Sequence, residues 1–310
     1  MQIFKSIEQI QIPEQTVATI GTFDGVHLGH RAVIKHLITE AKKRNTKSLL
    51  ITFEPHPRIV LNKNPKELKL ITNLTEKSRL LESIGLDYLL ILPFTYEFSQ
   101  NSARKFIEDY LIAKLHIQAM TIGYDHHFGR MDNEQEDIES ILKSYNIAVE
   151  RIPEMDINDG AVSSTKIRNA ISNGRIIEAN QLLGYQYKLC GTVVHGNKLG
   201  RTIGFPTANL MLSFKLKLIP ADGVYMVRVF HKEKEYMGMM NIGYRPTFQS
   251  NDRSIEVHII DFESIIYGEH IQLLIIQRIR NEVSFMNTEE LSRQLKKDKK
   301  YVEDNYSKGI

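Results

Sequence analysis

The sequence lacks the features that mark disulfide-rich, secreted and membrane-spanning proteins. Cys190 is the only cysteine among 310 residues, so neither an internal disulfide nor a cysteine-based metal cluster can form. No apolar run approaches the roughly 20 residues of a membrane span, since the best candidate, residues 89–92, stops at Pro93. The first ten residues include Lys5 and Glu8 and contain no apolar signal-peptide core. We therefore expect a cytoplasmic protein without a membrane partner.

A large excess of charge of either sign is also absent. The 40 Lys and Arg residues outnumber the 37 Asp and Glu residues by three, which gives a formal net charge of +3. This mildly basic balance suits anionic small molecules and does not indicate a nucleic-acid partner. We interpret the lysines at 296–300 as the solvated face of a terminal helix, with a nucleic-acid patch as the weaker alternative. The length and the 42% of hydrophobic residues indicate a globular protein of about two domains.

Strand and helix patterns alternate over the first part of the chain. Short aliphatic runs predict strands, and apolar residues at helical spacing predict the helices between them. This alternation is typical of a doubly wound parallel sheet with helices on both faces, whose ligands bind at the carboxyl ends of the strands. The predicted strands cover residues 16–20, 47–53, 88–92, 119–122 and 148–152; the predicted helices cover residues 28–43, 74–84, 103–115, 137–145 and a segment running to Ile171.

The first candidate site is the turn between the first of these strands and its helix, G-T-F-D-G-V-H-L-G-H at 21–30. The helix N-terminus presents free N–H groups to this turn, which makes it an anion site. His27 and His30 lie three residues apart, so both imidazoles can face the same anion. Gly29 has no side chain that would hold a phosphate away from the backbone. The spacing fits neither a Rossmann fingerprint nor a P-loop, and histidines that merely cap the helix are the alternative.

Three further segments lie at the ends of predicted strands or at the start of a helix. T-F-E-P-H-P at 52–57 contains two prolines, which fix the loop and remove N–H donors. G-Y-D-H-H-F-G-R at 123–130 has two adjacent histidines whose side chains point apart, which disfavours a metal site. V-S-S-T-K-I-R at 162–168 offers a serine N-cap with Lys166 and Arg168 as nearby cations. A well-capped surface helix is the alternative interpretation of this last segment.

From about residue 187 the pattern changes to short strands separated by glycine, proline and asparagine, as in a small antiparallel barrel. We therefore predict an α/β domain over residues 1–186, Rossmann-like in its alternation, and an all-β barrel domain with a C-terminal helix over residues 187–310. The predicted strands cover residues 188–194, 224–230, 236–242, 255–262 and 270–280, and the helix covers residues 288–306.

The second candidate site begins with G-R-T-I-G-F-P-T-A-N at 200–209. Thr207 and Asn209 offer oxygen ligands of the kind that Mg²⁺ accepts beside nucleotide phosphates. Arg201 and the glycines of this stretch can approach a phosphate closely. On a strand Glu256 shares a face with residue 258, so a rigid scaffold would hold its carboxylate in the barrel mouth. A plain turn at 206–209 is the alternative.

Taken in order, these motifs resemble those of the bacterial bifunctional riboflavin kinase/FAD synthetase family over nearly the whole chain. The N-terminal matches are G-x-F-D-G-V-H, H-x-G-H, T-F-x-P-H-P, G-Y-D-x-x-F-G and I-S-S-T-x-I-R, with Val162 in place of the first Ile. The C-terminal matches are G-R-x-x-G-x-P-T-A-N, G-V-Y, N-I-G-x-x-P-T-F, E-V-H-x-x-D-F and I-R-x-E-x-x-F. One departure is the loop at 131–135, which lacks the family's basic residue and glycine.

The resemblance implies two reactions. The C-terminal module phosphorylates riboflavin to FMN with ATP, and the N-terminal module adenylylates FMN to FAD and releases pyrophosphate, with Mg²⁺ as the metal. The kinase nucleophile is a hydroxyl that must lose a proton, for which Glu256 is the candidate base, whereas the FMN phosphate is already anionic. The implied residues are, for catalysis, His27, His30, Arg168 and Glu256; for the nucleotide, Gly21, Phe23, Asp24, Gly29, Ser164, Thr165, Gly200, Arg201, Gly204 and Pro206; for the flavin, Pro55, His56, Pro57, Asp125, Phe128, Arg280 and Glu282; and for the metal, Thr207 and Asn209.

Two alternatives stay open. One is an enzyme in which a single module is active, for which the altered loop at 131–135 is the only indication. The other is a flavin- or nucleotide-sensing regulator that kept both pockets without turnover. The presence of both histidines and of Glu256 argues against the regulator. The sequence does not indicate the oligomeric state.

Overall fold

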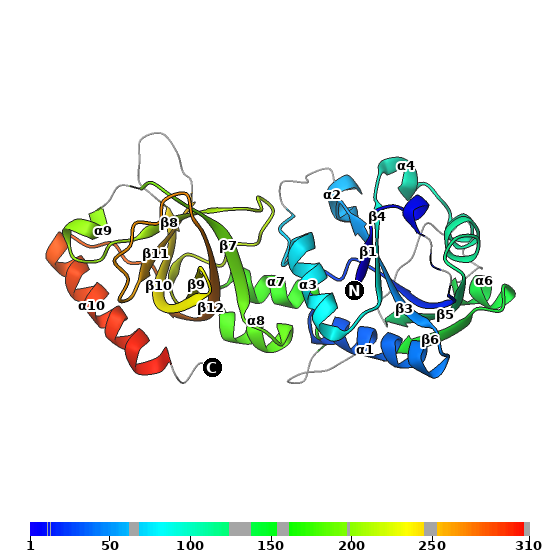
Figure 1. The fold of residues 1–310 in the computed structure, drawn as a ribbon. Coiled ribbons are helices and arrows are strands. Elements are labelled where there is room, and N and C mark those ends of the chain that lie inside the picture. Colours follow the sequence, from blue (N-terminus) through cyan, green and yellow to red (C-terminus); the bar gives the residue numbers. More distant parts are fainter. Residues whose placement is uncertain are drawn as a thin grey trace. The chain divides into compact units, whose positions relative to one another are not determined.

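The computed structural model describes residues 1–10, 12, 14–61, 68–123, 138–153, 161–196, 199–244 and 253–306 (Figure 1). The chain divides into two compact units, Met1–Ser164 and Thr165–Ile310. Each unit is built around its own β-sheet, as the change of pattern along the sequence predicts. Within the described ranges, no helix combines the length and the apolar character needed to cross a bilayer.

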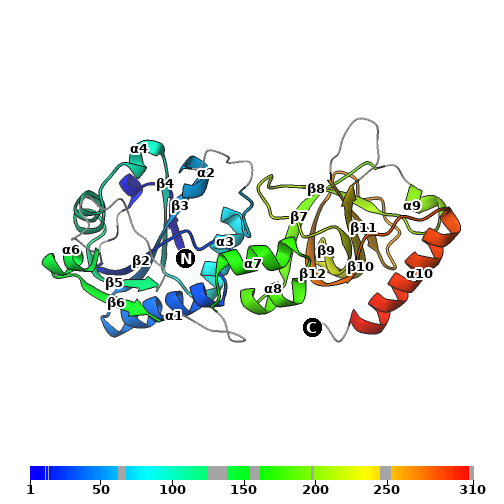
Figure 2. The ribbon, with the colours of Figure 1, turned by 180° about the vertical axis from the view of Figure 1, so that it is seen from behind.

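The first unit contains a six-stranded parallel sheet in the order β1-β4-β3-β2-β5-β6 (Figure 2). All five strands predicted for this part of the chain are confirmed, and the three-residue β1 is an addition too short to show a pattern. The strands are β1 (Gln2–Phe4), β2 (Thr16–Ile20), β3 (Lys47–Glu54), β4 (Tyr88–Pro93), β5 (Ile117–Gly123) and β6 (Ala148–Ile152).

Helices cover both faces of this sheet, because its central strands are apolar on both sides. In β3, Leu49 and Ile51 join the cluster under α5, η3 and α6, while Leu50 joins the cluster under α1 and α3. A strand buried on both faces gives the continuous apolar run that predicted it. The predicted helix at 103–115 is instead a short α-helix that continues as one π-helical segment. The helices are η1 (Ile7–Gln9), α1 (Leu28–Lys43), α2 (Pro57–Leu61), α3 (Leu74–Ile84), α4 (Tyr96–Ser99), α5 (Ala103–Phe106), the π-helix η3 (Ile107–Ile112) and α6 (Ile138–Ser144).

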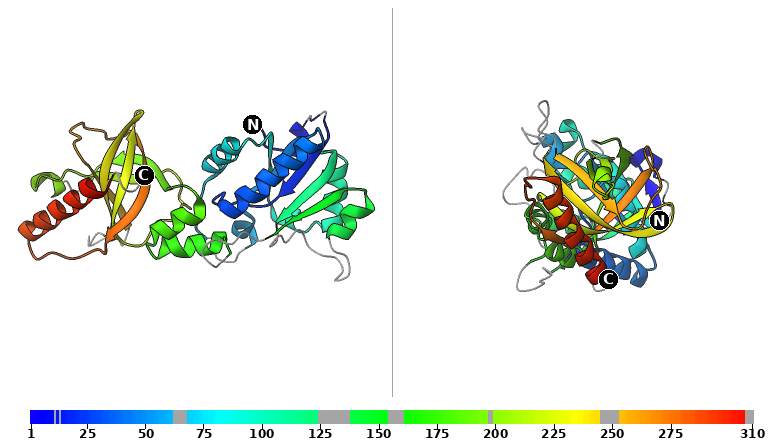
Figure 3. Two further views of the ribbon diagram at one scale, coloured as in Figure 1. Left: turned by 90° about the horizontal axis from the view of Figure 1, so that it is seen from below. Right: turned by 90° about the vertical axis from the view of Figure 1, so that its left-hand side faces the viewer.

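The second unit contains a closed antiparallel barrel in the order β10-β11-β8-β7-β12-β9. Helix α10 lies against the barrel (red in Figure 3), where Val302 joins a buried cluster with Met239. Strand β8 is an addition to the predicted strands, and β11 ends at Ile259, before Asp261 with its φ of 55°, rather than at residue 262. The elements are α7 (Ser164–Ser172), α8 (Ile176–Leu183), β7 (Tyr187–Val194), α9 (Leu199–Thr202), β8 (Ala208–Leu212), β9 (Gly223–His231), β10 (Lys234–Tyr244), β11 (Arg253–Ile259), β12 (His270–Arg280) and α10 (Thr288–Asn305).

The helices before the barrel belong to the second compact unit. Asn180 of α8 donates its Nδ2–H to the carbonyl oxygen of Ile275 (2.9 Å), and its Oδ1 accepts from the N–H of Tyr187 (2.8 Å). These bonds tie α8 to β12 and β7. The compact unit therefore begins at residue 165, whereas the domain boundary predicted from the sequence lies at 186/187.

Candidate active sites

The turn between β2 and α1 has an unusual backbone. Phe23, Gly25 and Val26 have positive φ angles of 46°, 88° and 38°. A positive φ is rare for residues with a side chain, so surrounding contacts must hold these residues in place. The N–H of Gly21 donates to the carbonyl oxygen of Ile51 (3.0 Å), which extends the β2–β3 pairing to the entrance of the turn.

Asp24 anchors the middle of this turn. Its carboxylate accepts hydrogen bonds from the N–H groups of Ile71 (3.1 Å) and Thr72 (3.0 Å) and from the Thr72 hydroxyl (3.2 Å). The Thr72 hydroxyl oxygen also accepts from the N–H of Gly25 (2.9 Å). Asp24 is 2% exposed, so its carboxylate serves the fold of the turn, and its direct contact with a nucleotide stays a prediction.

His27 caps the N-terminus of α1. Its Nδ1 accepts a hydrogen bond from the N–H of His30 (3.3 Å), and the two rings stack with their centroids 3.6 Å apart. Since an accepting Nδ1 carries no proton, the proton of the neutral ring lies on Nε2, which can donate to an anion. Phe23 packs edge-on against His30, with a centroid distance of 5.0 Å. Both histidines thus lie at the end of α1 that attracts anions.

The segment before α7 lies against the same turn. Ser164 donates its hydroxyl to the carbonyl oxygen of Asp24 (2.9 Å). A Cβ at Gly29 would lie 3.3 Å from the His27 ring and 3.4 Å from the carbonyl oxygen of Val162, which leaves little room for a side chain. The structure therefore brings together the predicted residues of the turn and Ser164. Thr165 and Arg168 follow on α7 in the second compact unit, and their part in the site stays a prediction.

The proline-containing loop follows β3 at the carboxyl edge of the sheet. His56, between Pro55 and Pro57, is 7% exposed, and its Nδ1 accepts from the N–H of Arg58 (3.1 Å). Next to this loop, Phe53 packs edge-on against Phe94, with a centroid distance of 5.4 Å. This aromatic pair is absent from the sequence prediction, although phenylalanines at the ends of β3 and just after β4 were a signal for it. Asp125, Phe128 and the loop at 131–135 lie outside the described residues.

The barrel brings together three residues predicted for the second site. The Thr207 hydroxyl donates to Oε2 of Glu256 (3.2 Å). Glu256 pairs with Asn209 of β8 on one side and with Asn241 of β10 on the other. Directly paired residues place their side chains on the same face of a sheet. Carboxylate, amide and hydroxyl groups thus gather across three neighbouring strands, so Thr207, Asn209 and Glu256 lie close together. Their roles in a reaction stay a prediction.

Glycines leave room for the polar side chains of this site. A Cβ at Gly196 would overlap with the side chain of Asn209, and a Cβ at Gly243 would overlap with the carboxylate of Glu282. Asn241 also donates its Nδ2–H to Oε1 of Glu282 (3.4 Å). Gly196 and Asn241 therefore lie beside the predicted site residues; no role was predicted for Gly196 from the sequence, and Asn241 was marked only as the first residue of the N-I-G-x-x-P-T-F motif.

His258 supports the stretch that carries Thr207. Its Nδ1–H donates to the carbonyl oxygen of Pro206 (2.9 Å), and its ring meets that of Phe205 edge-on at 5.1 Å. Burial lowers the pKa of His258, and the hydrogen bond to Pro206 opposes that shift only in part. A neutral ring with its proton on Nδ1 fits this role. Just before this stretch, Gly204 has a φ of 82°, which favours glycine.

Arg280 is engaged by the terminal helix. Its guanidinium donates to both carboxylate oxygens of Asp298 (2.8–3.2 Å), whose side chain is 3% exposed. It also lies 5.8 Å from the ring centroid of Phe285. These contacts attach α10 to the end of β12, and a flavin contact of Arg280 stays a prediction. Arg201 is exposed on α9, at the start of the predicted phosphate-binding stretch.

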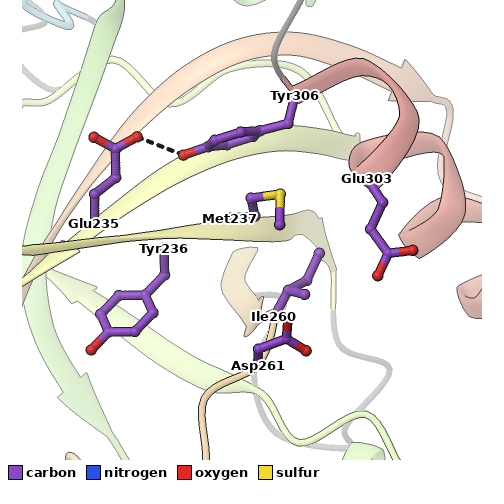
Figure 4. Close-up of a pocket in the computed structure, with 7 residues that line it drawn as sticks. All are labelled: Glu235, Tyr236, Met237, Ile260, Asp261, Glu303 and Tyr306. Carbon is purple, nitrogen blue, oxygen red and sulfur yellow. Dashed lines mark hydrogen bonds between the residues drawn. The ribbon is translucent and has the colours of Figure 1, made fainter.

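A pocket of about 510 Å³ lies elsewhere on the second unit, between β10, the turn after β11 and the end of α10 (Figure 4). Tyr306 donates to Glu235 (2.7 Å), and burial together with this bond raises the pKa of Tyr306 to about 12. Met237 of the pocket is four residues from Asn241, the partner of Glu256, which corresponds to about 13 Å along a strand. The pocket is therefore separate from the Glu256 site. Its lining consists of Glu235, Tyr236, Met237, Ile260, Asp261, Glu303 and Tyr306.

Among the residues that the structure describes, one group of possible metal ligands lies away from both sites. Ligand atoms of His36, Glu40 and Glu150 lie within 4.8 Å of one another. Lys43 contacts Glu40 at 2.5 Å, and Arg44 contacts Glu150 at 3.4 Å. Because both carboxylates have cationic partners, we interpret this group as an ion-pair network that joins α1 to β6.

Comparison with known proteins gives matches over both units. The family model for FAD synthetase matches residues 9–166, and that for riboflavin kinase matches residues 183–306. The bifunctional riboflavin kinase/FMN adenylyltransferase of Listeria monocytogenes serovar 1/2a is 40% identical over 284 residues, which cover 91% of this chain and 90% of that protein. The protein of the same name from Escherichia coli K12 is 37% identical over 304 residues, 96% of each chain. A crystal structure described as a macrolide-efflux protein from Streptococcus pneumoniae has a TM-score of 0.89 and 33% identity, covering 97% of this chain and 98% of that one.

Proposed function

Since the chain belongs to the bifunctional riboflavin kinase/FAD synthetase family, we propose that it carries out its two reactions at two separate sites. The enzyme phosphorylates riboflavin to FMN with ATP and adenylylates FMN to FAD. We assign the adenylylation to the turn at 21–30 and the phosphorylation to the barrel residues around Glu256. As catalytic domains we propose residues 1–186 and 187–310, which the two matched family models support in their order along the chain.

In the adenylylation, an oxygen of the FMN phosphate attacks the α-phosphorus of ATP, and pyrophosphate leaves. The nucleophile is already ionised, so the site needs no general base. It must hold two polyanions together and stabilise the charge on the transferring phosphorus. The N-terminus of α1 and Nε2–H of His27 supply donors for this purpose, and we assign Arg168 to the same task.

In the phosphorylation, a riboflavin hydroxyl attacks the γ-phosphorus of ATP and loses its proton, the bond to the β,γ-bridging oxygen breaks, and ADP leaves. Glu256 is the candidate base, because a rigid strand holds its carboxylate among polar neighbours. The oxygen donors of Thr207 and Asn209 fit Mg²⁺, a hard cation that prefers oxygen ligands. When bound, Mg²⁺ would neutralise charge on the ATP phosphates. Thr207 would then position the metal while it donates to Glu256.

The observation that carries the proposal is that each unit assembles its own set of predicted residues: His27, His30 and Ser164 around one turn, and Thr207, Asn209 and Glu256 across one face of the barrel. The substrates are small molecules, and we propose that the enzyme works in the cytoplasm, where ATP is available.

The test is to incubate the purified chain with riboflavin, ATP and Mg²⁺ and to separate FMN from FAD by chromatography. A second incubation starts from FMN and ATP. We expect FMN and FAD in the first and FAD in the second. If the first incubation gives FMN and neither incubation gives FAD, only the kinase module is active. If flavin binds but neither incubation gives a product, the result supports a flavin-sensing regulator.

A further inference from the structure

Lys77 of α3 is a buried lysine next to the adenylylation site. It is 5% exposed, and its Nζ donates to the carbonyl oxygen of Thr22 (2.6 Å) and to the hydroxyl of Thr52 (3.4 Å). Burial lowers the pKa of Lys77, while the carboxylates of Asp24 and Glu54 offset part of the shift. Removing a cation from water is unfavourable, and an apolar residue at this position would avoid that cost. A buried lysine at this position therefore indicates that its ammonium group has a specific role.

The contacts of Lys77 complete a set of anchors on one turn. Thr72 holds Asp24 and the N–H of Gly25, and Lys77 holds the carbonyl oxygen of Thr22. Thr72 lies just before α3, and Lys77 lies in the first turn of that helix. These two residues thus hold the turn at Thr22, Asp24 and Gly25, next to the positive φ angles of Phe23, Gly25 and Val26. His27 follows the turn directly, so the position of its ring depends on these anchors.

We propose that Lys77 is a positioning residue for FMN adenylylation, holding the turn at 21–26 through Thr22 and placing a fixed positive charge behind it. This inference rests on the proposed assignment of that reaction to the turn. The charge lies in a poorly solvated region, where it acts more strongly on a bound polyanion than a surface cation does. A shift of about 1 Å in a positioned group can lower a rate about 10²-fold.

The test compares Lys77→Met, which removes the ammonium, with Lys77→Gln, which keeps a neutral donor. Arg79→Met is the matched control, because it removes a cation from the exposed face of the same helix. FMN adenylylation is measured per folded molecule, with the folded fraction taken from circular dichroism, so unfolded protein does not enter the rate. We expect both Lys77 variants to lose about 10- to 100-fold in kcat, with KM values for ATP and FMN within about threefold of wild type. Riboflavin phosphorylation should be unchanged in both Lys77 variants. Arg79→Met should keep the wild-type rate of FMN adenylylation.

Three results would overturn the inference. A Lys77→Met rate per folded molecule within threefold of wild type would show that the ammonium is not needed. Full activity of Lys77→Gln alone would show that a neutral donor suffices. Equal losses of both reactions would indicate a general structural role. If the wild type makes no FAD from FMN, the proposed function itself fails; if it makes FAD and the Lys77 variants are unaffected, only this inference fails.

Discussion

The imidazole rings of His27 and His30 stack 3.6 Å apart, centroid to centroid, at the first turn of α1. The His30 N–H donates to Nδ1 of His27, so the backbone fixes which nitrogen of His27 can donate outward. One residue therefore caps the helix through Nδ1 and keeps Nε2–H as the donor that we assign to the anion. The two roles can be separated by mutation.

His27→Asn should keep the cap and remove the catalytic donor, because asparagine is among the strongest N-cap residues. We expect FAD formation from FMN to fall about 10²- to 10³-fold, as for other lost transition-state donors. Thermal stability and riboflavin phosphorylation should stay near wild type. His27→Ala, which also removes the cap, should in addition lower the free energy of unfolding by about 1 kcal/mol. Undiminished FAD formation by His27→Asn would remove His27 from the mechanism.

Gly196→Ala should impair the kinase through Asn209. The added Cβ would overlap with the Asn209 side chain and displace a proposed metal ligand. We expect riboflavin phosphorylation to fall about 10²-fold, as for other misplaced groups, and FMN adenylylation to be unaffected. Gly268→Ala is the control, since it strains a residue with a φ of 79° but adds its Cβ to open space. That control should keep kinase activity; a Gly196→Ala enzyme with normal kinase activity would argue against the role of Asn209.

His258 should make the barrel less stable in mild acid. Its pKa is lowered in the folded barrel by burial, so the unfolded chain binds a proton that the folded chain does not. The free energy of unfolding should therefore fall as the pH decreases below about 6.5, the ordinary histidine value. Urea unfolding at two pH values gives the loss of unfolding free energy between them, and this loss should be smaller for His258→Gln than for the wild type. His270→Gln, at an exposed position, is the control and should show the same loss of unfolding free energy between the two pH values as the wild type.

Most of the fold could be predicted from the sequence because hydrophobic periodicity is local. The strand at 148–152 and the helices at 28–43 and 74–84 match the structure residue for residue. The sequence does not predict strand β8, since five residues after a proline carry little pattern and their pairing partners lie far along the chain. Helix α8 was not predicted, and the domain boundary was placed after it, because its attachment to the barrel depends on Asn180.

For the two candidate sites, too, local features could be predicted from the sequence and long-range contacts could not. Motif residues can be recognised from their spacing, whereas contacts between distant segments cannot. Lys77 lies 55 residues from Thr22, and His258 lies 52 residues from Pro206. Nothing local distinguishes Lys77 from the solvated lysines of other helices. Only the tertiary structure shows that its Nζ reaches the turn.

Two fragments test the predicted boundary against the compact unit. A fragment of residues 187–310 should make FMN from riboflavin and no FAD, as the predicted kinase domain requires. A fragment of residues 165–310 should do the same and be more stable by more than about 2 kcal/mol, because α8 buries Ile176, Leu182 and Leu183 and binds β7 and β12 through Asn180. Urea unfolding measures the difference. If the shorter fragment does not fold, the kinase domain begins near residue 165.

Glu256→Gln should abolish most kinase activity without loss of structure. Glutamine keeps the size of the side chain and an oxygen that can accept the bond from Thr207, but it cannot take the hydroxyl proton. We expect FMN formation to fall about 10²- to 10⁴-fold, the range for loss of a general base. FAD formation from supplied FMN should be unchanged, because that reaction uses an ionised nucleophile at another site. Glu233→Gln, at an exposed turn of the same barrel, is the matched control and should leave both rates unchanged. Normal phosphorylation by Glu256→Gln would exclude Glu256 as the base and leave proton removal to another group of the barrel.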